Sequence, residues 1–500
     1  MKTKMNVACV LAAMAIVGMS ANAETRVWTA ATGNWSDPTS WADGALPEAG
    51  DDVALVGSGS AGGNLLLGGA TTVALSAISN MDSRCGWTFT NGIVNLAAGT
   101  VVMDNVGTLQ FWTQLASSGT TTLVKRGAGT LIFNAANTAL TCAIVLEDGR
   151  LQILDDLSLG AVPDTLRADA ITLRGGALFN NDNVVNIAPT RGVTVDGVGY
   201  FAARSVNGLL VVSSPVTGTG NVCILQQSGS VHFDTVNTYT GETVLGHDTH
   251  PFKFGNNVDF VVGVDGALPA TTTLRSVVTG AALALDGTTQ RIAGLDGGKS
   301  LAVNGPGTLR FGAADDGALA LTNVSLAADA TLAYAGAGTL DVKLSSAATG
   351  TTFRLDSGTL ALNAPSALGA AMLSAPVPVC DVEMMPMDSP RPTFWSPGVS
   401  VVKITQSAVF AKAETSCVVA SQPSSVTIDE PCGASVASSG RSSPSAVPNV
   451  YAWSPESVSV VPPETPSANR TGSDAENEAA PSRTSGFGTV PVPTASVAPS

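Results

Sequence analysis

A short sequence phrase recurs along this chain and sets the main constraint on its fold. Each copy has a glycine, a residue of any type, an apolar residue, another residue of any type and a second apolar residue. The copies are Gly99–Met103, Gly129–Phe133, Gly149–Ile153, Gly229–Phe233, Gly307–Phe311, Gly338–Val342 and Gly358–Leu362. Neighbouring copies lie about 20 to 31 residues apart, or are separated by gaps that could hold several such intervals, which is the spacing expected of solenoid turns.

Each copy has the alternation of a half-buried β-strand. The third and fifth positions are apolar and face one side, whereas the fourth is often polar, as at Gln152, His232, Arg310 and Asp341. The strand therefore has one core-facing side and one solvent-facing side.

The glycine that opens each copy is expected to supply a positive φ or a tight bend. A trailing asparagine, such as Asn134 or Asn137, is expected to adopt left-handed backbone at the next corner. The positions assigned to the structural repeat are Gly129, Leu131, Phe133, Gly229, Val231, Phe233, Asn237, Gly241, Gly307, Leu309, Phe311, Gly358 and Leu360.

One such unit cannot bury its apolar residues alone, but stacked units form a continuous core in which each strand pairs with the turns above and below. The prediction is an all-β solenoid over residues 99–376. A β-sandwich uses the same strands and turns. The fixed phrase favours the solenoid.

The composition is consistent with this fold. The formal net charge is −15, and only 13% of the 500 residues are charged. Scarce lysine, glutamate and arginine argue against long helices. The absence of clustered basic residues argues against a nucleic-acid partner or an anionic membrane.

Residues 1–23 have the pattern of a secretory signal peptide. Lys2 and Lys4 precede an apolar stretch, and Ala21-Asn22-Ala23 forms a small-x-small cleavage site before Glu24. No later segment is apolar for long enough to predict a transmembrane helix. The chain is therefore expected to be exported.

Residues 24–98 are interpreted as a tryptophan-rich cap with the first turns. Trp28, Trp35 and Trp41 lie close together among turn-forming residues. A solenoid needs a cap because its first turn otherwise exposes core and unpaired strand edges. The alternative is a platform on which sugars stack.

Several segments resemble the autotransporter-associated β-strand repeat. They are Lys125–Thr138 followed by Leu146–Ala161, Asn237–Leu245 followed by Val261–Pro269, and Asp356–Ala370. The resemblance implies a right-handed parallel β-helix that is displayed as an adhesin-like passenger or surface-layer component of a Gram-negative-type bacterium. The segment 136–140 departs from the motif because it lacks the Tyr-Thr-Gly sequence.

Residues 377–500 differ sharply in composition. Sixteen of the 27 prolines but only six of the 53 glycines lie in residues 381–500. Such Pro/Ser-rich sequence is expected to be disordered. One hypothesis is a frameshift that begins between Val377 and Met387, and the alternative is a genuine Ser/Pro stalk.

Three adjacent carboxylate pairs are candidates for catalysis: Asp51-Asp52, Asp155-Asp156 and Asp315-Asp316. Solenoids can host polysaccharide-degrading sites, but neighbouring residues on a strand point in opposite directions. Turn and solvated-edge roles are therefore favoured, and no catalytic residue is predicted.

The cluster His247, Asp248 and His250 has three potential metal ligands but no evident fourth, which favours a polar turn. The segment Phe179–Asn183 is interpreted as an asparagine turn and not as a calcium loop. Cys142 is expected to be buried, because it is in phase with Ile144 and Leu146. No metal or cofactor is predicted.

The sequence thus predicts an exported, non-enzymatic, structural or adhesin-like protein that lies on the cell surface or outside the cell. Its expected partners are extracellular glycans or the surfaces of host or neighbouring cells. A carbohydrate-binding or polysaccharide-degrading β-helix is the alternative. A groove lined by carboxylates and a basic residue would favour that alternative, whereas flat faces of Thr, Asn and Ser would favour the adhesin.

Overall fold

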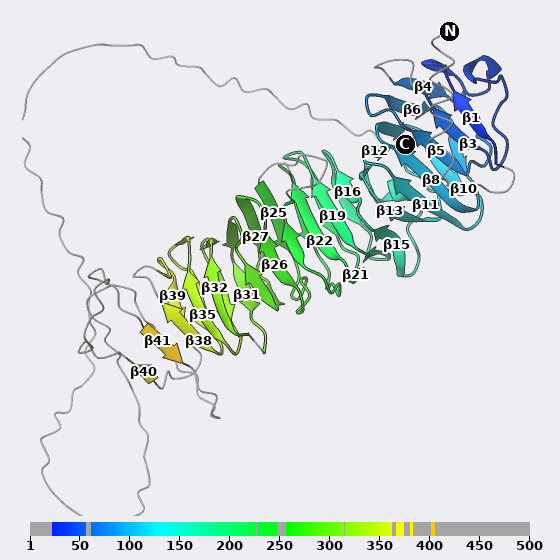
Figure 1. The fold of residues 1–500 in the computed structure, drawn as a ribbon. Coiled ribbons are helices and arrows are strands. Elements are labelled where there is room, and N and C mark those ends of the chain that lie inside the picture. Colours follow the sequence, from blue (N-terminus) through cyan, green and yellow to red (C-terminus); the bar gives the residue numbers. More distant parts are fainter. Residues whose placement is uncertain are drawn as a thin grey trace, which may run out of the picture. The chain divides into compact units, whose positions relative to one another are not determined.

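The chain forms a parallel β-solenoid of about 14 turns (Figure 1). The computed structural model describes residues 23–56, 62–226, 228–247, 257–314, 316–362 and 367–374, and the strands at 381–383 and 402–405. All of these belong to one unit, residues 1–429. The predicted all-β solenoid is confirmed.

Each complete turn visits three faces in a fixed order. Face 1 contains β1 (Thr25–Trp28), β3 (Asp52–Leu55), β5 (Ala77–Asn80), β8 (Gly99–Asn105), β11 (Thr121–Arg126), β13 (Cys142–Leu146), β15 (Arg167–Leu173), β18 (Arg191–Val195) and β21 (Val216–Gly218) in one sheet, and β28 (Thr289–Ile292), β31 (Gly307–Phe311), β34 (Ala330–Tyr334), β37 (Thr352–Leu355) and β39 (Met372–Ser374) in another.

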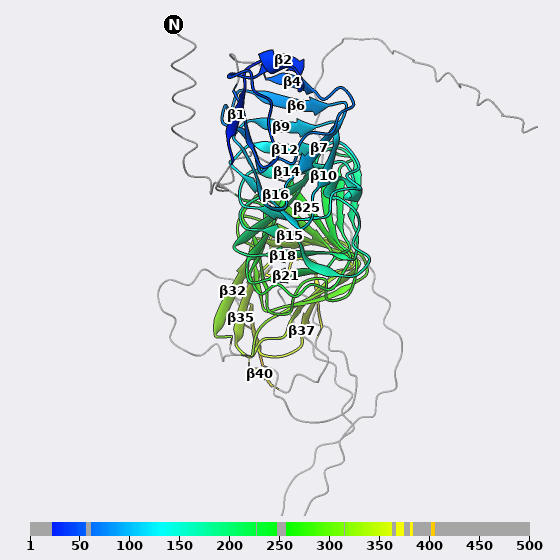
Figure 2. The same cartoon turned by 90° about the vertical axis from the view of Figure 1, so that its right-hand side faces the viewer.

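Face 2 carries the longest uninterrupted sheet, which has 12 strands. Figure 2 shows its first strands one after another. They are β2 (Thr32–Asn34), β4 (Gly63–Leu66), β6 (Gly86–Thr90), β9 (Thr108–Phe111), β12 (Thr130–Phe133), β14 (Arg150–Ile153), β16 (Ala177–Asn180), β19 (Val198–Ala203), β22 (Asn221–Gln226), β24 (Thr243–Leu245), β26 (Thr273–Ser276) and β29 (Gly294–Asp296).

A second sheet continues face 2 with β32 (Ala318–Thr322), β35 (Thr339–Lys343) and β38 (Thr359–Leu362). Two short strands of the predicted tail, β40 (Asp381–Glu383) and β41 (Val402–Thr405), extend this sheet in antiparallel fashion. The rest of the predicted tail lies outside the described residues, as do the signal peptide up to residue 22 and, apart from β40, the hypothetical frameshift site.

Face 3 begins with the pair β7 (Ile93–Leu96) and β10 (Gln114–Ser117). It resumes with β17 (Val184–Ile187), β20 (Leu209–Val212), β23 (Ser230–Phe233), β25 (Asn257–Val262), β27 (Gly280–Ala284), β30 (Leu301–Asn304), β33 (Val324–Leu326) and β36 (Ser346–Ala347). Two short 3-10 helices, η1 (Pro38–Ser40) and η2 (Asp156–Leu159), complete the described elements.

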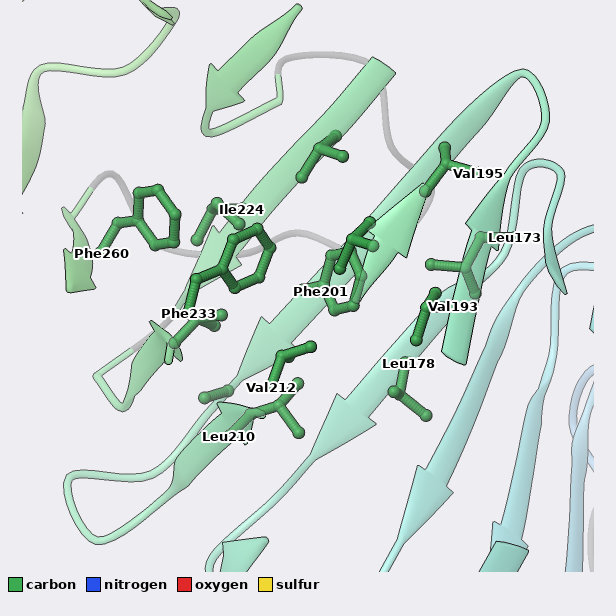
Figure 3. Close-up of a cluster of buried hydrophobic side chains, with 14 of the residues drawn as sticks. Leu173, Leu178, Val193, Val195, Phe201, Leu210, Val212, Ile224, Phe233 and Phe260 are labelled. Carbon is green, nitrogen blue, oxygen red and sulfur yellow. The ribbon is translucent and has the colours of Figure 1, made fainter. Parts of the chain in front are cut away.

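The core is a column of apolar side chains that all three faces supply. In-register strands place like residues above one another, so that Phe89 stacks on Phe111 with ring centroids 4.9 Å apart. Figure 3 shows the middle of the column, where Phe233 contacts Phe201 and Phe260. This continuous burial is the main stabilising term of the stack.

The recurring phrase is used on every face, which corrects the expectation that its spacing measures one turn. The two 20-residue intervals join directly paired strands of face 2, β12 with β14 and β35 with β38. The intervals of 30 and 31 residues instead lead from a strand on face 1 to a strand on face 2 of the following turn, from β8 to β12 and from β31 to β35. The phrase therefore encodes a corner followed by a strand, which any face can use.

The phrase glycines have two different roles. Gly149 has a positive φ of 66°, as expected. Gly129 does not, and a Cβ there would lie 2.1 Å from the carbonyl oxygen of Gly107 in the turn before. Glycine at this second position lets adjacent turns approach closely.

The assignment of left-handed backbone to Asn134 or Asn137 is wrong. The non-glycine residues with positive φ in the described chain are Asn91, Asp286, Asn323 and Asp329. Asn137 is instead 1% exposed, and its side chain accepts a hydrogen bond from Leu115 N (2.8 Å) and donates one to Ser158 O (2.5 Å). Its role is to connect turns through a buried amide.

Candidate functional site

A shallow, open groove lies on the outside of face 1. It has a volume of about 440 Å³ and crosses β11, β13, β15, β18 and β21. Ala143 and Val145 form an apolar part of its lining, and Thr172 and Thr194 add hydroxyl groups. The groove therefore spans several turns.

A bulge in β15 shapes this groove. Arg167 pairs with Arg191 of β18, but the next pair is Ile171 with Val193, so three residues of β15 lie opposite one residue of β18. The extra residues carry Asp169 outward, where its side chain is 73% exposed and lies 3.5 Å from Arg167. Bulges commonly redirect side chains in this way.

An ion-pair ladder lies along the corner between faces 1 and 2. Arg126 Nε lies 2.7 Å from Glu147, Glu147 lies 4.0 Å from Arg174, and Arg174 Nε lies 3.1 Å from Asp196. Arg174 and Asp196 also line the groove. Four successive turns thus contribute alternating charges to this corner.

The groove meets the compositional test for the enzymatic alternative, since it has two carboxylates and a basic residue. Its geometry does not resemble an acid/base pair, however. Asp196 is 59% exposed and is paired with Arg174, and Asp169 is more exposed still. A general-acid carboxyl usually needs a sheltered, apolar setting. Neither carboxylate of the groove has such a setting.

Columns of threonine also lie on face 1. Thr172, Thr194 and Thr217 are in register on three consecutive turns, and the hydroxyl oxygens of Thr194 and Thr217 are 3.3 Å apart. A second column on four consecutive turns contains Thr289, Thr308, Thr331 and Thr352. Face 1 therefore has both a groove with carboxylates and a basic residue and a surface rich in threonine.

The three candidate tryptophans form a buried cluster at the first turn. The exposed fractions are 0% for Trp28, 8% for Trp35 and 3% for Trp41. The ring of Trp41 meets those of Trp28 and Trp35 edge-on, at centroid distances of 5.1 and 4.9 Å. Their position fits a cap, which stays a prediction. Their ring faces are not open for sugar stacking.

Sequence reasoning missed Trp112, which is 61% exposed at the corner after β9. Trp112 directly follows the buried Phe111. Because neighbouring residues of a strand point in opposite directions, the alternation predicts that Trp112 points away from the core. An exposed tryptophan is a common contact residue for sugars and proteins.

The carboxylate pairs have structural partners. Asp155 caps η2 by accepting a hydrogen bond from Ser158 N (2.8 Å), and Asp156 forms an ion pair with the buried Arg191 (2.9 Å). Asp316 accepts a hydrogen bond from Ala313 N (2.8 Å), whereas residue 315 lies outside the described residues.

Asp51 and Asp52 differ in their environment. Burial acts to raise the pKa of Asp51, but hydrogen bonds from Glu48 N, Glu24 N and Arg26 outweigh it and leave that pKa lowered. Burial, together with the charge of Asp51, raises the pKa of Asp52. Asp51 is engaged by three donors of the first turns.

The remaining candidates also have local roles. His247 contacts Tyr200 Oη at 3.1 Å, whereas Asp248 and His250 lie outside the described residues. In Phe179–Asn183, the Asn180 side chain donates to Leu209 O (3.0 Å) and accepts from Asn183 N (3.3 Å), as in an asparagine turn. Cys142 is buried, and burial raises the pKa of its thiol to about 11.

The described ranges contain no group of three or more His, Cys, Asp or Glu side chains placed to hold a metal ion. The helices found there are too short to cross a membrane.

No family model matches this chain, and neither does a curated protein or a solved structure. The fold and the surface geometry are therefore the basis for a functional proposal.

Proposed function

We propose that this protein is an exported bacterial solenoid that acts at the cell surface or outside the cell as a structural or adhesive element and not as an enzyme. The observation that carries the proposal is the pair of in-register threonine columns on face 1. The secretory pattern of residues 1–23 and the resemblance to autotransporter-associated repeats support export and display.

The proposed mechanism is multivalent contact along a stiff surface. Parallel pairing repeats a side chain about every 4.8 Å along the stack, so one face offers the same polar group to a partner several times. Each contact is weak, but contacts made by one rigid body act together. The buried column provides the rigidity.

A binding assay with the full chain tests this mechanism. Beads that carry the exported protein are incubated with bacterial and host cells, and retention is compared with that of a Thr172→Val, Thr194→Val, Thr217→Val variant. Retention should fall, because valine keeps the shape but removes the hydroxyls. Unchanged retention in this variant and in the matched Thr308→Val, Thr331→Val, Thr352→Val variant would contradict the proposal.

A second candidate function is binding of a neutral linear glycan in the groove. The groove offers threonine hydroxyls beside paired charges, in which Arg174 faces Asp196 and Arg167 faces Asp169. Sugar hydroxyls are bound by such groups, and the chain's net charge of −15 disfavours a polyanion.

Titration with neutral and acidic oligosaccharides distinguishes the candidates. Binding of a neutral chain that is lost in Thr194→Val, but not in Thr331→Val outside the groove, supports the groove. Release of shorter products from any glycan would overturn the non-enzymatic proposal.

A further inference from the structure

Asp51 is a buried carboxylate at the start of the solenoid. It is 4% exposed and lies directly before β3. Its Oδ1 accepts a hydrogen bond from Glu24 N (3.0 Å), and its Oδ2 accepts from Glu48 N (2.9 Å) and Arg26 Nε (3.1 Å). A carboxylate with so little solvent needs such donors.

The surroundings of Asp51 are short of positive charge. Arg26 is the cation of this cluster, and it faces three carboxylates: Glu24 at 2.6 Å, Asp43 at 2.8 Å and Asp51 at 3.1 Å. Asp52 adds a fourth acidic group beside Asp51, and its pKa is raised by burial and by the Asp51 charge. A second cation at this position would therefore be stabilising.

Glu24 is also the residue that follows the predicted signal-peptide cleavage site. Hydrolysis of the Ala23–Glu24 bond by a signal peptidase, with water as co-reactant, leaves a carboxylate on Ala23 and an amino group on Glu24. That amino group takes up a proton at neutral pH, because the pKa of a free α-amino group is about 7.7–8.

We propose that signal-peptide removal completes the first turn, because it converts the Glu24 N–H into an ammonium that forms an ion pair with buried Asp51. The nitrogen already lies within hydrogen-bond distance of Oδ1, so the pair needs no rearrangement. The ion pair links Glu24, directly before β1, to the residue that precedes β3, beside the backbone hydrogen bond from Asp52 N to Glu24 O (2.9 Å).

Ala23 is 8% exposed in the folded chain, so its carbonyl side is sheltered from a peptidase. Cleavage therefore precedes closure of the first turn. This order fits export of an unfolded chain, and the inference rests on the export part of the proposed function.

The test compares two chains that share everything from Glu24 onward and differ in where the N-terminal ammonium lies. One begins at Glu24 and the other at Ala21, which moves the ammonium three residues away. Hydrogen exchange of the Asp52 amide is the readout. Exchange should be about tenfold slower in the Glu24 chain, equivalent to one pKa unit of stabilisation. Asp51→Asn should abolish this difference, whereas Asp43→Asn, which removes another Arg26 partner, should preserve it.

The pH dependence provides a second readout that needs no variant. Pairing with a carboxylate raises the folded-state pKa of the amine, so the extra protection is complete below about pH 7.7 and is lost as the pH rises through the folded pKa. Arg26, Glu24, Asp43, Asp51, Glu48 and Asp52 are the charged groups at this site. An N-terminal amine that titrates at or below its ordinary pKa in the Glu24 chain would overturn the inference.

The N-terminus of the exported protein separates the two proposals. If mass spectrometry finds a mature chain that begins elsewhere than Glu24, the ion pair is refuted and export still stands. If the protein is not exported, the proposed function fails, and the pair of chains still decides whether the ammonium binds Asp51.

Discussion

Face 2 is joined by backbone pairing from β2 to β29 and its sheet then breaks between β29 and β32, whereas faces 1 and 3 each contain a gap that spans more than one turn. The gap in face 3 lies between β10 and β17, and the gap in face 1 between β21 and β28. Buried amide side chains cross both gaps. Continuity of the solenoid is thus maintained by paired strands in one region, and in the other by particular side chains together with isolated backbone hydrogen bonds, such as Thr238 N to Val216 O (2.9 Å) and Ser117 N to Ala139 O (3.2 Å).

Asn137 crosses the face 3 gap, and two residues cross the gap in face 1. Asn237 accepts from Val216 N (2.8 Å) and donates to Ala267 O (2.8 Å). Gln290 accepts from Leu268 N (3.0 Å) and donates to Val264 O (2.7 Å). All three are at most 3% exposed. Strand pairing requires only that apolar and polar residues alternate. Each of these three positions, in contrast, requires an amide side chain that can both accept and donate a hydrogen bond.

The largest expected effect concerns Arg191, which crosses turns beside the face 3 gap. Its guanidinium binds Asp156 and donates to Gly160 O (2.9 Å) and Leu159 O (3.3 Å). Arg191→Met should lower the free energy of unfolding by about 4–5 kcal/mol, because it leaves a mostly buried carboxylate without its partner. Urea unfolding measures this change in free energy. A decrease of less than about 1 kcal/mol, as expected for an exposed arginine, would contradict the comparison.

Asn137 and Asn134 give a matched pair within one copy of the phrase. Asn137→Ala should cost about 3 kcal/mol, because the Leu115 N–H and the Ser158 carbonyl lose their partner in the core. Hydrogen exchange of the Leu115 amide should accelerate accordingly. Asn134→Ala should cost less than about 1 kcal/mol, since the Asn134 side-chain nitrogen has no hydrogen-bond partner. Equal costs would remove the distinction between the two asparagines.

Lys125 sharpens the comparison, because it is a buried cation within the paired region. Its ammonium donates to Arg126 O and Gly127 O at a corner, and burial lowers its pKa from 10.5 to about 8. The unfolded chain therefore binds more protons between these values. Stability should rise by roughly 2–3 kcal/mol from pH 8 to 10.5 relative to Lys125→Met. If the free energies of unfolding of the unaltered protein and of Lys125→Met change with pH in the same way, this prediction is refuted.

The smallest effect is expected at the exposed ion-pair ladder. Arg174→Met should cost less than about 1 kcal/mol, because Arg174 is 48% exposed and solvent screens its charge. The melting temperatures of the unaltered protein and of Arg174→Met, measured at low and high salt, test this expectation. A loss comparable with that of Arg191→Met would mean that the ladder also holds the turns together.

Much of the local structure could be predicted from the sequence. Leu131 and Phe133 lie in the core with Ile132 between them at the surface side of β12, as the alternation indicates. The groove could not be predicted, because it depends on a bulge opposite β18, and pairing register between residues more than 20 positions apart leaves no local signal.

The sequence by itself determined that this chain forms short strands with one apolar side and stacks them into a solenoid, because alternation and turn-forming glycines act locally. The tertiary structure decided which face each copy of the phrase occupies, where the sheets are interrupted and which amides cross the gaps. The physical reason is that a buried Asn137 or Asn237 has a defined role only once the turns on both sides supply its donor and acceptor.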